Sequence, residues 1–281
     1  MGAAFAVTLL ANLLLVISSL TGAEEDTLVQ AKYLMTIGGR ATWNSEQLPP
    51  SFVSLSSGQD SGLPQCMLKP PKDIPEPEFP GREKPVVIAL ADGQPLSCNG
   101  ALGETNCYKY NPEMGDWHYY GETLYSGKAR AYDFHPEVGL VIAGGYNGTE
   151  MDVVEMSQPG QDLGRRFERL PNLPMQLTYS CLVIINMTTI FVAGGQSIYA
   201  PSVNNVFTLN LASREWKEEP QMKEARSSHT CSLVETENGS KKIVVVGGSA
   251  VVSMIRDNFG SVEIFDTSTN EWITGRRVIH F

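Results

Sequence analysis

The fold is decided by residues 226–272, which contain Arg226-Ser-Ser-His-Thr-Cys-Ser-Leu-Val234, Lys241-Lys-Ile-Val-Val-Val-Gly-Gly248, Ser261-Val-Glu-Ile-Phe-Asp266 and Trp272. The three runs are short and rich in β-branched or apolar residues, and clusters of Gly, Asn and Ser separate them. Such runs are typical of β-strands rather than helices. The stretch is therefore interpreted as one unit of several strands that ends in an aromatic residue.

The same unit recurs upstream, and its copies align at a pair of glycines that follows a hydrophobic run. These pairs are Gly38-Gly39, Gly144-Gly145, Gly194-Gly195 and Gly247-Gly248. The steps from Gly144 to Gly194 and from Gly194 to Gly247 are 50 and 53 residues. Downstream, the second to fifth copies each place an aromatic residue on the predicted outer strand: Trp117, Phe167, Trp216 and Trp272. A repeat of this length with four short strands predicts a β-propeller.

This set of motifs resembles the kelch repeat, from about Ala31 to Trp272. The second copy differs, because Cys98-Asn-Gly100 replaces the glycine pair; Asn tolerates a positive φ better than most residues. The resemblance implies an all-β, kelch-type β-propeller. About five blades are visible, and they are expected near residues 28–71, 85–124, 129–170, 177–219 and 226–272.

The ring is expected to be incomplete. Kelch propellers often have six or seven blades, and blade one (28–71) lacks an evident first strand. The sequence ends nine residues after Trp272, before a strand that could close the ring. Closure removes unpaired sheet edges, so the chain is interpreted as truncated. A Pro-rich stretch at 69–80 is interpreted as a connection between blades, because Pro171 and Pro220 lie at equivalent places.

Residues 1–22 predict a secretory signal peptide, which leaves 23–281 as the propeller domain. The segment is almost wholly apolar from Ala3 to Ile17, ends in small residues and is followed by Glu24-Glu-Asp26. The alternative is an uncleaved membrane anchor, which needs ~20 apolar residues. We therefore expect a secreted, extracellular protein. Membrane attachment is expected only if this segment stays or a missing tail carries an anchor.

The charge and the cysteines narrow the function further. The formal net charge of −10 argues against nucleic acid as a partner. Cys98 and Cys107 are predicted to form a disulfide, as suits an exported chain. Cys181 and Cys231 are expected as buried thiols rather than a bridge. Cys66 has no evident partner.

Three sequons for N-glycosylation fall in predicted turns, at Asn147, Asn186 and Asn238. The first follows a glycine pair, and the other two lie between a first and a second strand. Behind a signal peptide, they predict modification of at least one asparagine.

No catalytic or cofactor-binding set is evident. The histidines His118, His135, His229 and His280 are scattered, and there is no Cys-x-x-Cys pair or phosphate-binding Gly-rich loop. His229 stands where kelch repeats often carry His, which implies a structural role. We expect no cofactor and no metal. The aromatic residues Tyr119, Tyr120 and Tyr146 are expected to pack between blades rather than to face a ligand.

The favoured function is a non-catalytic scaffold that binds a protein or a glycan. Two alternatives stay open. A galactose-oxidase-like extracellular enzyme would need copper ligands from Tyr and His, and these cannot be assigned here. An intracellular-type kelch adaptor, for a ubiquitin ligase or for actin, would depend on other domains or on access to the cytosol. Because fold does not fix function, the step from propeller to binding rests on analogy.

Overall fold

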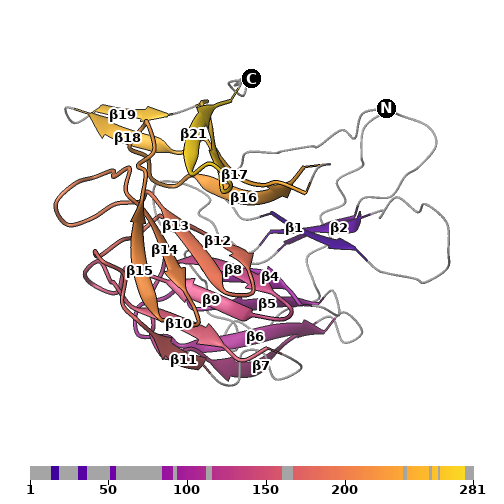
Figure 1. Ribbon diagram of the computed structural model, residues 1–281. Coiled ribbons are helices and arrows are strands. Elements are labelled where there is room, and N and C mark those ends of the chain that lie inside the picture. Colours follow the sequence, from indigo (N-terminus) through magenta and orange to yellow (C-terminus); the bar gives the residue numbers. More distant parts are fainter. Residues whose placement is uncertain are drawn as a thin grey trace, which may run out of the picture.

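The computed structural model describes residues 84–90, 94–111, 116–159, 167–236, 239–252, 255–258 and 260–275, together with three strands nearer the N-terminus, at 14–18, 31–36 and 51–54. Every regular element in this part of the chain is a β-strand (Figure 1). It contains no helix that is long and apolar enough to cross a membrane.

Four antiparallel sheets of four strands form the body of the molecule. Blade two contains β4 (Val86–Ala89), β5 (Pro95–Cys98), β6 (Asn106–Asn111) and β7 (Asp116–Glu122). Blade three contains β8 (Ala131–His135), β9 (Gly139–Ala143), β10 (Val154–Ser157) and β11 (Phe167–Leu170). Blade four contains β12 (Cys181–Asn186), β13 (Thr189–Ala193), β14 (Val206–Asn210) and β15 (Glu215–Glu219). Blade five contains β16 (Thr230–Glu235), β17 (Lys241–Val246), β20 (Val262–Asp266) and β21 (Glu271–Thr274).

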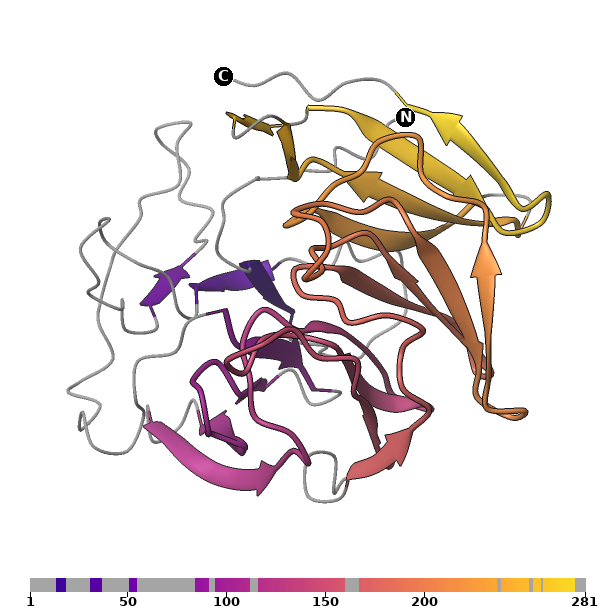
Figure 2. The ribbon, with the colours of Figure 1, turned by 90° about the vertical axis from the view of Figure 1, so that its left-hand side faces the viewer.

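The blades follow one another around a common centre, as Figure 2 shows from magenta through orange to yellow. In each blade the strands pair in chain order, and the first strands β4, β8, β12 and β16 contact one another in sequence. The first strand is therefore the innermost and the fourth the outermost. This is the arrangement of a β-propeller, so the predicted fold class is confirmed.

A further sheet of three antiparallel strands lies at the N-terminal side: β1 (Leu14–Ser18), β2 (Ala31–Thr36) and β3 (Ser51–Ser54). β2 and β3 are the strands that the sequence predicts for blade one. β1 supplies the first strand that blade one otherwise lacks, and it comes from the apolar core of the predicted signal peptide. Cleavage after that peptide stays a prediction.

A two-stranded hairpin, β18 (Ser249–Val252) and β19 (Ile255–Asn258), is inserted between β17 and β20. This hairpin was not predicted from the sequence. Blades three and four have loops at the corresponding place, so blade five carries an additional ribbon at this end of its strands.

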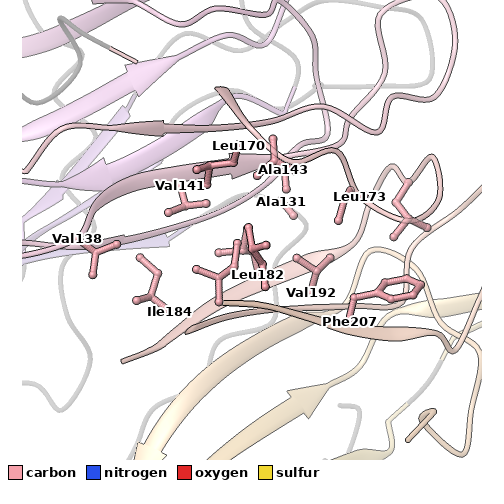
Figure 3. Close-up of a cluster of buried hydrophobic side chains, with 14 of the residues drawn as sticks. Ala131, Val138, Val141, Ala143, Leu170, Leu173, Leu182, Ile184, Val192 and Phe207 are labelled. Atoms are coloured by element: carbon pink, nitrogen blue, oxygen red, sulfur yellow. The ribbon is translucent and has the colours of Figure 1, made fainter. Parts of the chain in front are cut away.

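Apolar side chains fill the spaces between neighbouring blades. Figure 3 shows the layer between blades three and four, where Val141 and Ala143 of β9 face Leu182 and Ile184 of β12. Strands of the central blades are nearly continuous hydrophobic runs because both of their faces are covered. Each fully buried Val or Leu contributes ~1.5–3 kcal/mol relative to an exposed one. Blade-to-blade packing is thus the main source of stability.

The ring is open on the far side of blade five (Figure 2). Val141 and Phe191, which face the next blade from blades three and four, are both 0% exposed. Their counterpart in blade five is Val244, which also stands three residues before a glycine pair but is only half-buried. This sheet therefore packs fully on blade four and less completely on its other face.

Candidate interaction face

The glycine pairs join each blade to the next. Gly144 and Gly194 have φ values of 60° and 59°, which L side chains rarely adopt. The second glycine of each pair donates its N–H to the connection that enters the next blade: Gly145 N to Leu177 O at 2.7 Å and Gly195 N to Arg226 O at 2.8 Å. The end of the propeller that carries these pairs is called the glycine-pair face below. Gly38 and Gly39 lie outside the described residues.

Blade two uses Asn99-Gly100 in the same way. Asn99 has a φ of 58°, and Gly100 N donates to Gly127 O at 2.9 Å. The Asn99 side chain also donates to Thr123 Oγ1 at 2.7 Å. The departure from the repeat pattern therefore preserves the turn.

A chain of backbone hydrogen bonds surrounds the centre of this face. Lys84, Ala129, Tyr179 and Ser228 directly precede or approach the first strands, and their φ values are 51°, 52°, 56° and 56°. Ala129 N donates to Lys84 O at 3.2 Å, Tyr179 N to Ala129 O at 3.0 Å and Ser228 N to Tyr179 O at 2.9 Å. Each blade is thus tied to its predecessor near the axis of the propeller, where the first strands begin; this place is called the channel mouth below. A lysine, an alanine, a tyrosine and a serine share no chemical property, so no sequence pattern predicts these hydrogen bonds.

Two of these residues meet across the mouth. Lys84 Nζ lies 3.8 Å from the centre of the Tyr179 ring, although blade three stands between their blades. The ring member of blade three is Ala129, whose small side chain leaves room for this contact. A second lysine, Lys128, lies 6.0 Å from the Tyr146 ring centre on the same face. Such cation–π contacts contribute ~0.5–1 kcal/mol at exposed sites.

The β13–β14 loop projects an apolar tip from this face. Ser197 and Ala200 exchange backbone hydrogen bonds at 2.9 and 3.2 Å, and Ser197 Oγ accepts from Tyr199 N at 3.3 Å. The turn so formed presents Ile198, 50% exposed, and Tyr199, 89% exposed. Glycine-pair spacing alone does not reveal this tip, since the loop is longer than its counterpart in blade three.

The tip of that shorter loop carries Asn147, the first predicted glycosylation site. Asn147 is exposed, and its backbone N–H donates to Thr149 O at 3.0 Å. Asn186 is exposed at the β12–β13 turn, which is at the opposite end of the strands, and its Oδ1 accepts from Thr188 N at 2.9 Å. Asn238 lies outside the described residues.

Two buried ion pairs, which the sequence analysis missed, support the joints between blades. Arg130 Nη1 lies 2.5 Å from Glu155 Oε1, and Arg226 Nη2 lies 2.8 Å from Glu263 Oε1. The two carboxylates occupy the same position of the repeat, one residue into β10 and β20. The arginines come from different positions, which hides the pairing in the sequence.

Each ion pair also forms hydrogen bonds with main-chain atoms of the joint. Arg130 Nε donates to Gly144 O at 3.0 Å, and Arg226 Nη1 donates to Gly247 O at 2.8 Å. The carboxylates accept from the incoming connections, Leu124 N to Glu155 at 2.6 Å and Lys223 N to Glu263 at 2.7 Å. Burial raises the pKa of Glu155, and the Arg130 guanidinium opposes that shift. These acids therefore have a structural role, and the two Arg–Glu pairs are called pins below.

His229 is also a packing residue. Its Nε2–H donates to Ala193 O at 3.1 Å, and its ring lies against Gly194. Burial, together with the charge of Arg226, lowers the pKa of His229 to about 3, so the imidazole is neutral at ordinary pH. His118 lies on the outermost strand β7, His135 ends β8, and His280 lies outside the described residues. Within the ranges described, no group of three or more His, Cys, Asp or Glu side chains could hold a metal ion.

The predicted repeat aromatics occupy the outer strands. Trp216 Nε1 donates to Pro171 O at 3.0 Å, and Trp272 Nε1 donates to Pro220 O at 2.6 Å. Both acceptors belong to the proline connections between blades. The other two aromatics are Trp117 on β7, which is buried, and Phe167 at the start of β11, which is half-buried.

Two disulfides are present among the residues that the structure describes. Cys98 and Cys107 are bonded across β5 and β6 of blade two. Cys181 and Cys231 are bonded as well, between β12 and β16, so the expectation of two unlinked thiols is wrong. The reason is strand register. Cys181 pairs with the last residue of β13, whereas in blade five the residue that pairs with the last residue of β17 is Thr230 and not Cys231. Because side chains alternate along a strand, this offset of one residue turns Cys231 toward blade four. Cys66 lies outside the described residues.

Comparison with protein families matches residues 231–276 to the kelch motif. The match begins in β16 and extends past β21, so it spans blade five and confirms the resemblance drawn from the repeat. A search of curated proteins finds no match.

Proposed function

We propose that this chain, a kelch-repeat protein, is a non-catalytic scaffold that binds another protein through its glycine-pair face. Kelch repeats generally mediate protein–protein interactions. The observation that carries the proposal is Tyr199, which is 89% exposed at the tip of a hydrogen-bonded turn. A side chain that is this exposed buries too little surface to stabilise the fold.

The physical case rests on preorganisation. Tyr is enriched among the residues that dominate binding energy at interfaces, because it offers a large apolar area at low cost in conformational entropy. The turn at Ser197 has already ordered the backbone of the tip, so binding loses less entropy. Tyr146, Tyr179 and two lysines at the channel mouth extend the surface on the same face. A projecting tip fits a pocket on a folded protein better than it fits a small sugar.

We further propose that the protein is secreted and N-glycosylated, with residues 1–22 removed. Their removal takes away β1 (Leu14–Ser18) and leaves blade one with β2 and β3. Two of its sequon asparagines are exposed, and its two disulfides suit an oxidising compartment. Expression in secretory cells should place the protein in the medium. Removal of N-glycans by a glycosidase should lower its mass, and an unchanged mass would contradict the glycosylation.

The proposal that the protein is not an enzyme is supported by the structural roles of its buried acids and its buried histidine. Glu155 and Glu263 are paired with arginines, and His229 is used in packing. The copper-oxidase alternative has a direct test: metal analysis of the purified protein and an assay of sugar oxidation. Stoichiometric copper with oxidase activity would overturn the scaffold proposal.

Binding is tested by comparing two tyrosine variants. Tyr199→Ala removes the tip, and Tyr119→Ala removes a tyrosine that is 58% exposed on the outer strand β7. Partners captured from the fluid around expressing cells should be retained by the wild type and by Tyr119→Ala. They should be lost or weakened at least tenfold by Tyr199→Ala. Equal capture by all three proteins would show that the glycine-pair face is not the binding surface.

A further inference from the structure

We propose that the Cys181–Cys231 disulfide is a reducible lock that fixes blade five on blade four and thereby sets the spacing of the loops on the glycine-pair face. The effect on binding rests on the function proposed above. The lock itself does not, and it can be tested without a partner.

The bond joins the innermost strands of two neighbouring blades. Cys181 begins β12, and Cys231 is the second residue of β16. It lies beside the channel mouth, where Ser228 N donates to Tyr179 O at 2.9 Å. Movement of β16 away from β12 would therefore open the backbone ring at this point.

The loops of the two blades are also connected above the bond. Ser202 Oγ donates to Ser249 O at 3.3 Å, and Gln196 Nε2 donates to Ser227 Oγ at 3.2 Å. The first contact links the β13–β14 loop, which carries Tyr199, to the start of the β18–β19 hairpin, and the second links it to the segment that leads into β16. They are weak neutral hydrogen bonds. The disulfide adds a covalent link between β12 and β16, the innermost strands of the two blades that carry these loops.

The two disulfides differ in their exposure. Cys98 and Cys107 are each 0% exposed and lie on adjacent strands of one sheet, so reduction there would release no blade. Cys181 is 7% exposed, while Cys231 is half-buried on β16, where every second residue is exposed. An external thiolate can therefore reach the Cys231 sulfur more readily than either sulfur in blade two.

The chemistry is thiol–disulfide exchange with an external dithiol. A thiolate of the dithiol attacks the Cys231 sulfur, forms a mixed disulfide and releases the Cys181 thiolate, which takes up a proton. The second thiol of the reagent then attacks the mixed disulfide and frees Cys231. The protein gains two electrons and two protons, and the dithiol is oxidised to its cyclic disulfide.

The test is graded reduction of the folded, full-length protein by dithiothreitol, followed by alkylation and mass spectrometry. We expect Cys181 and Cys231 to be alkylated at least tenfold faster than Cys98 and Cys107. Hydrogen exchange should rise in β16, β17, β20 and β21 when the first pair is reduced, while blades two and three stay protected. Loss of both pairs together, or earlier loss of Cys98–Cys107, would overturn the proposal.

A variant checks the structural consequence separately. Cys181→Ser/Cys231→Ser should show the increased exchange in blade five without any reductant. If this variant does not fold, stepwise reduction of the wild type still decides the order of cleavage. Unchanged exchange after selective reduction of the first pair would also overturn the lock. Failure of Tyr199→Ala to affect binding would leave these results untouched, so the two proposals fail independently.

Discussion

At the scale of single residues, the glycine pairs can be recognised in the sequence, whereas other residues that shape the joints between blades cannot. The glycine pairs could be predicted because they recur with fixed spacing and each ends a hydrophobic run. The positive φ of Lys84, Ala129 and Tyr179 could not, since nothing in those residue types requires it. The Arg–Glu pins were equally hidden, because their arginines do not hold one repeat position.

Gly194→Ala is expected to lower the free energy of unfolding by ~2–4 kcal/mol. An added Cβ would lie 2.7 Å from Arg226 O, in a backbone with φ of 59°. Gly148→Ala is the control, because Gly148 also has a positive φ, of 88°, yet has no atom within 4 Å of the added Cβ. Urea denaturation measures both. Equal losses would mean that conformational strain alone, and not the joint to the next blade, accounts for the cost.

His229 should make the protein less stable in acid. Its pKa is about 3 in the folded state, below the ordinary value of 6.5. Above pH 6.5 the residue is neutral whether folded or unfolded. Between pH 6.5 and about 3 the unfolded chain binds a proton that the folded one excludes, so stability falls by up to ~1.4 kcal/mol per pH unit. Below that window this contribution levels off.

His229→Gln isolates this contribution, because glutamine can still donate to Ala193 O and does not titrate. Urea denaturation at pH 7, 5.5 and 4 should show a smaller loss of stability for the variant than for the wild type. The other acids near Arg226, Glu224 and Glu263, are common to both proteins and cancel in the comparison. Identical pH slopes would contradict the assignment of a buried neutral imidazole.

At the scale of elements, strand pairing followed the sequence more closely than the links between strands did. The short apolar runs predicted the strands, because a strand whose sheet is covered on both faces needs apolar side chains on both sides. The hairpin β18–β19 was not predicted, although Val251, Val252 and Ile255 are β-branched, because blades three and four have only a loop at this place. The bridge between Cys181 and Cys231 escaped too, because it depends on a register offset of one residue that spacing to the glycine pair does not show.

Loss of the disulfide between blades should cost more than loss of the one within blade two. The first closes a separation of 50 residues and the second a separation of 9. Loop-closure entropy gives ~4 kcal/mol for Cys181→Ala/Cys231→Ala and ~2.5 kcal/mol for Cys98→Ala/Cys107→Ala. Guanidinium denaturation of both double variants measures the difference. The opposite order would show that packing around Cys98 and Cys107, which are wholly buried, outweighs chain entropy.

At the scale of the whole molecule, the propeller is held together by repeated joints and is open beyond blade five. Repetition is why the architecture could be predicted from one sequence: each copy supports the interpretation of the others. The proposed interaction face could not be predicted. It depends on Tyr199 and Ile198, which belong to a loop that varies between copies.

Two equivalent valines measure the openness of the ring. Val141 and Val244 both stand three residues before a glycine pair and face away from the preceding blade, but only Val141 is completely buried. Val141→Ala should lower the free energy of unfolding by ~2 kcal/mol and Val244→Ala by less than ~1 kcal/mol. Thermal or urea unfolding compares them. If both cost the same, the outer face of blade five is covered in solution.

The backbone ring at the channel mouth has one more consequence. Its bonds run only between main-chain atoms of Lys84, Ala129, Tyr179 and Ser228, so the hydrogen bonds themselves require no particular side chain. Two restrictions apply to substitution at these positions. The positive φ disfavours Val, Ile and Thr at all four, and Ala129 is buried, so the side chain there must stay small. A cation, a methyl group, an aromatic ring and a hydroxyl fill them now. The chemistry of the channel mouth can therefore change through single substitutions at these positions, while the strands of the propeller stay the same.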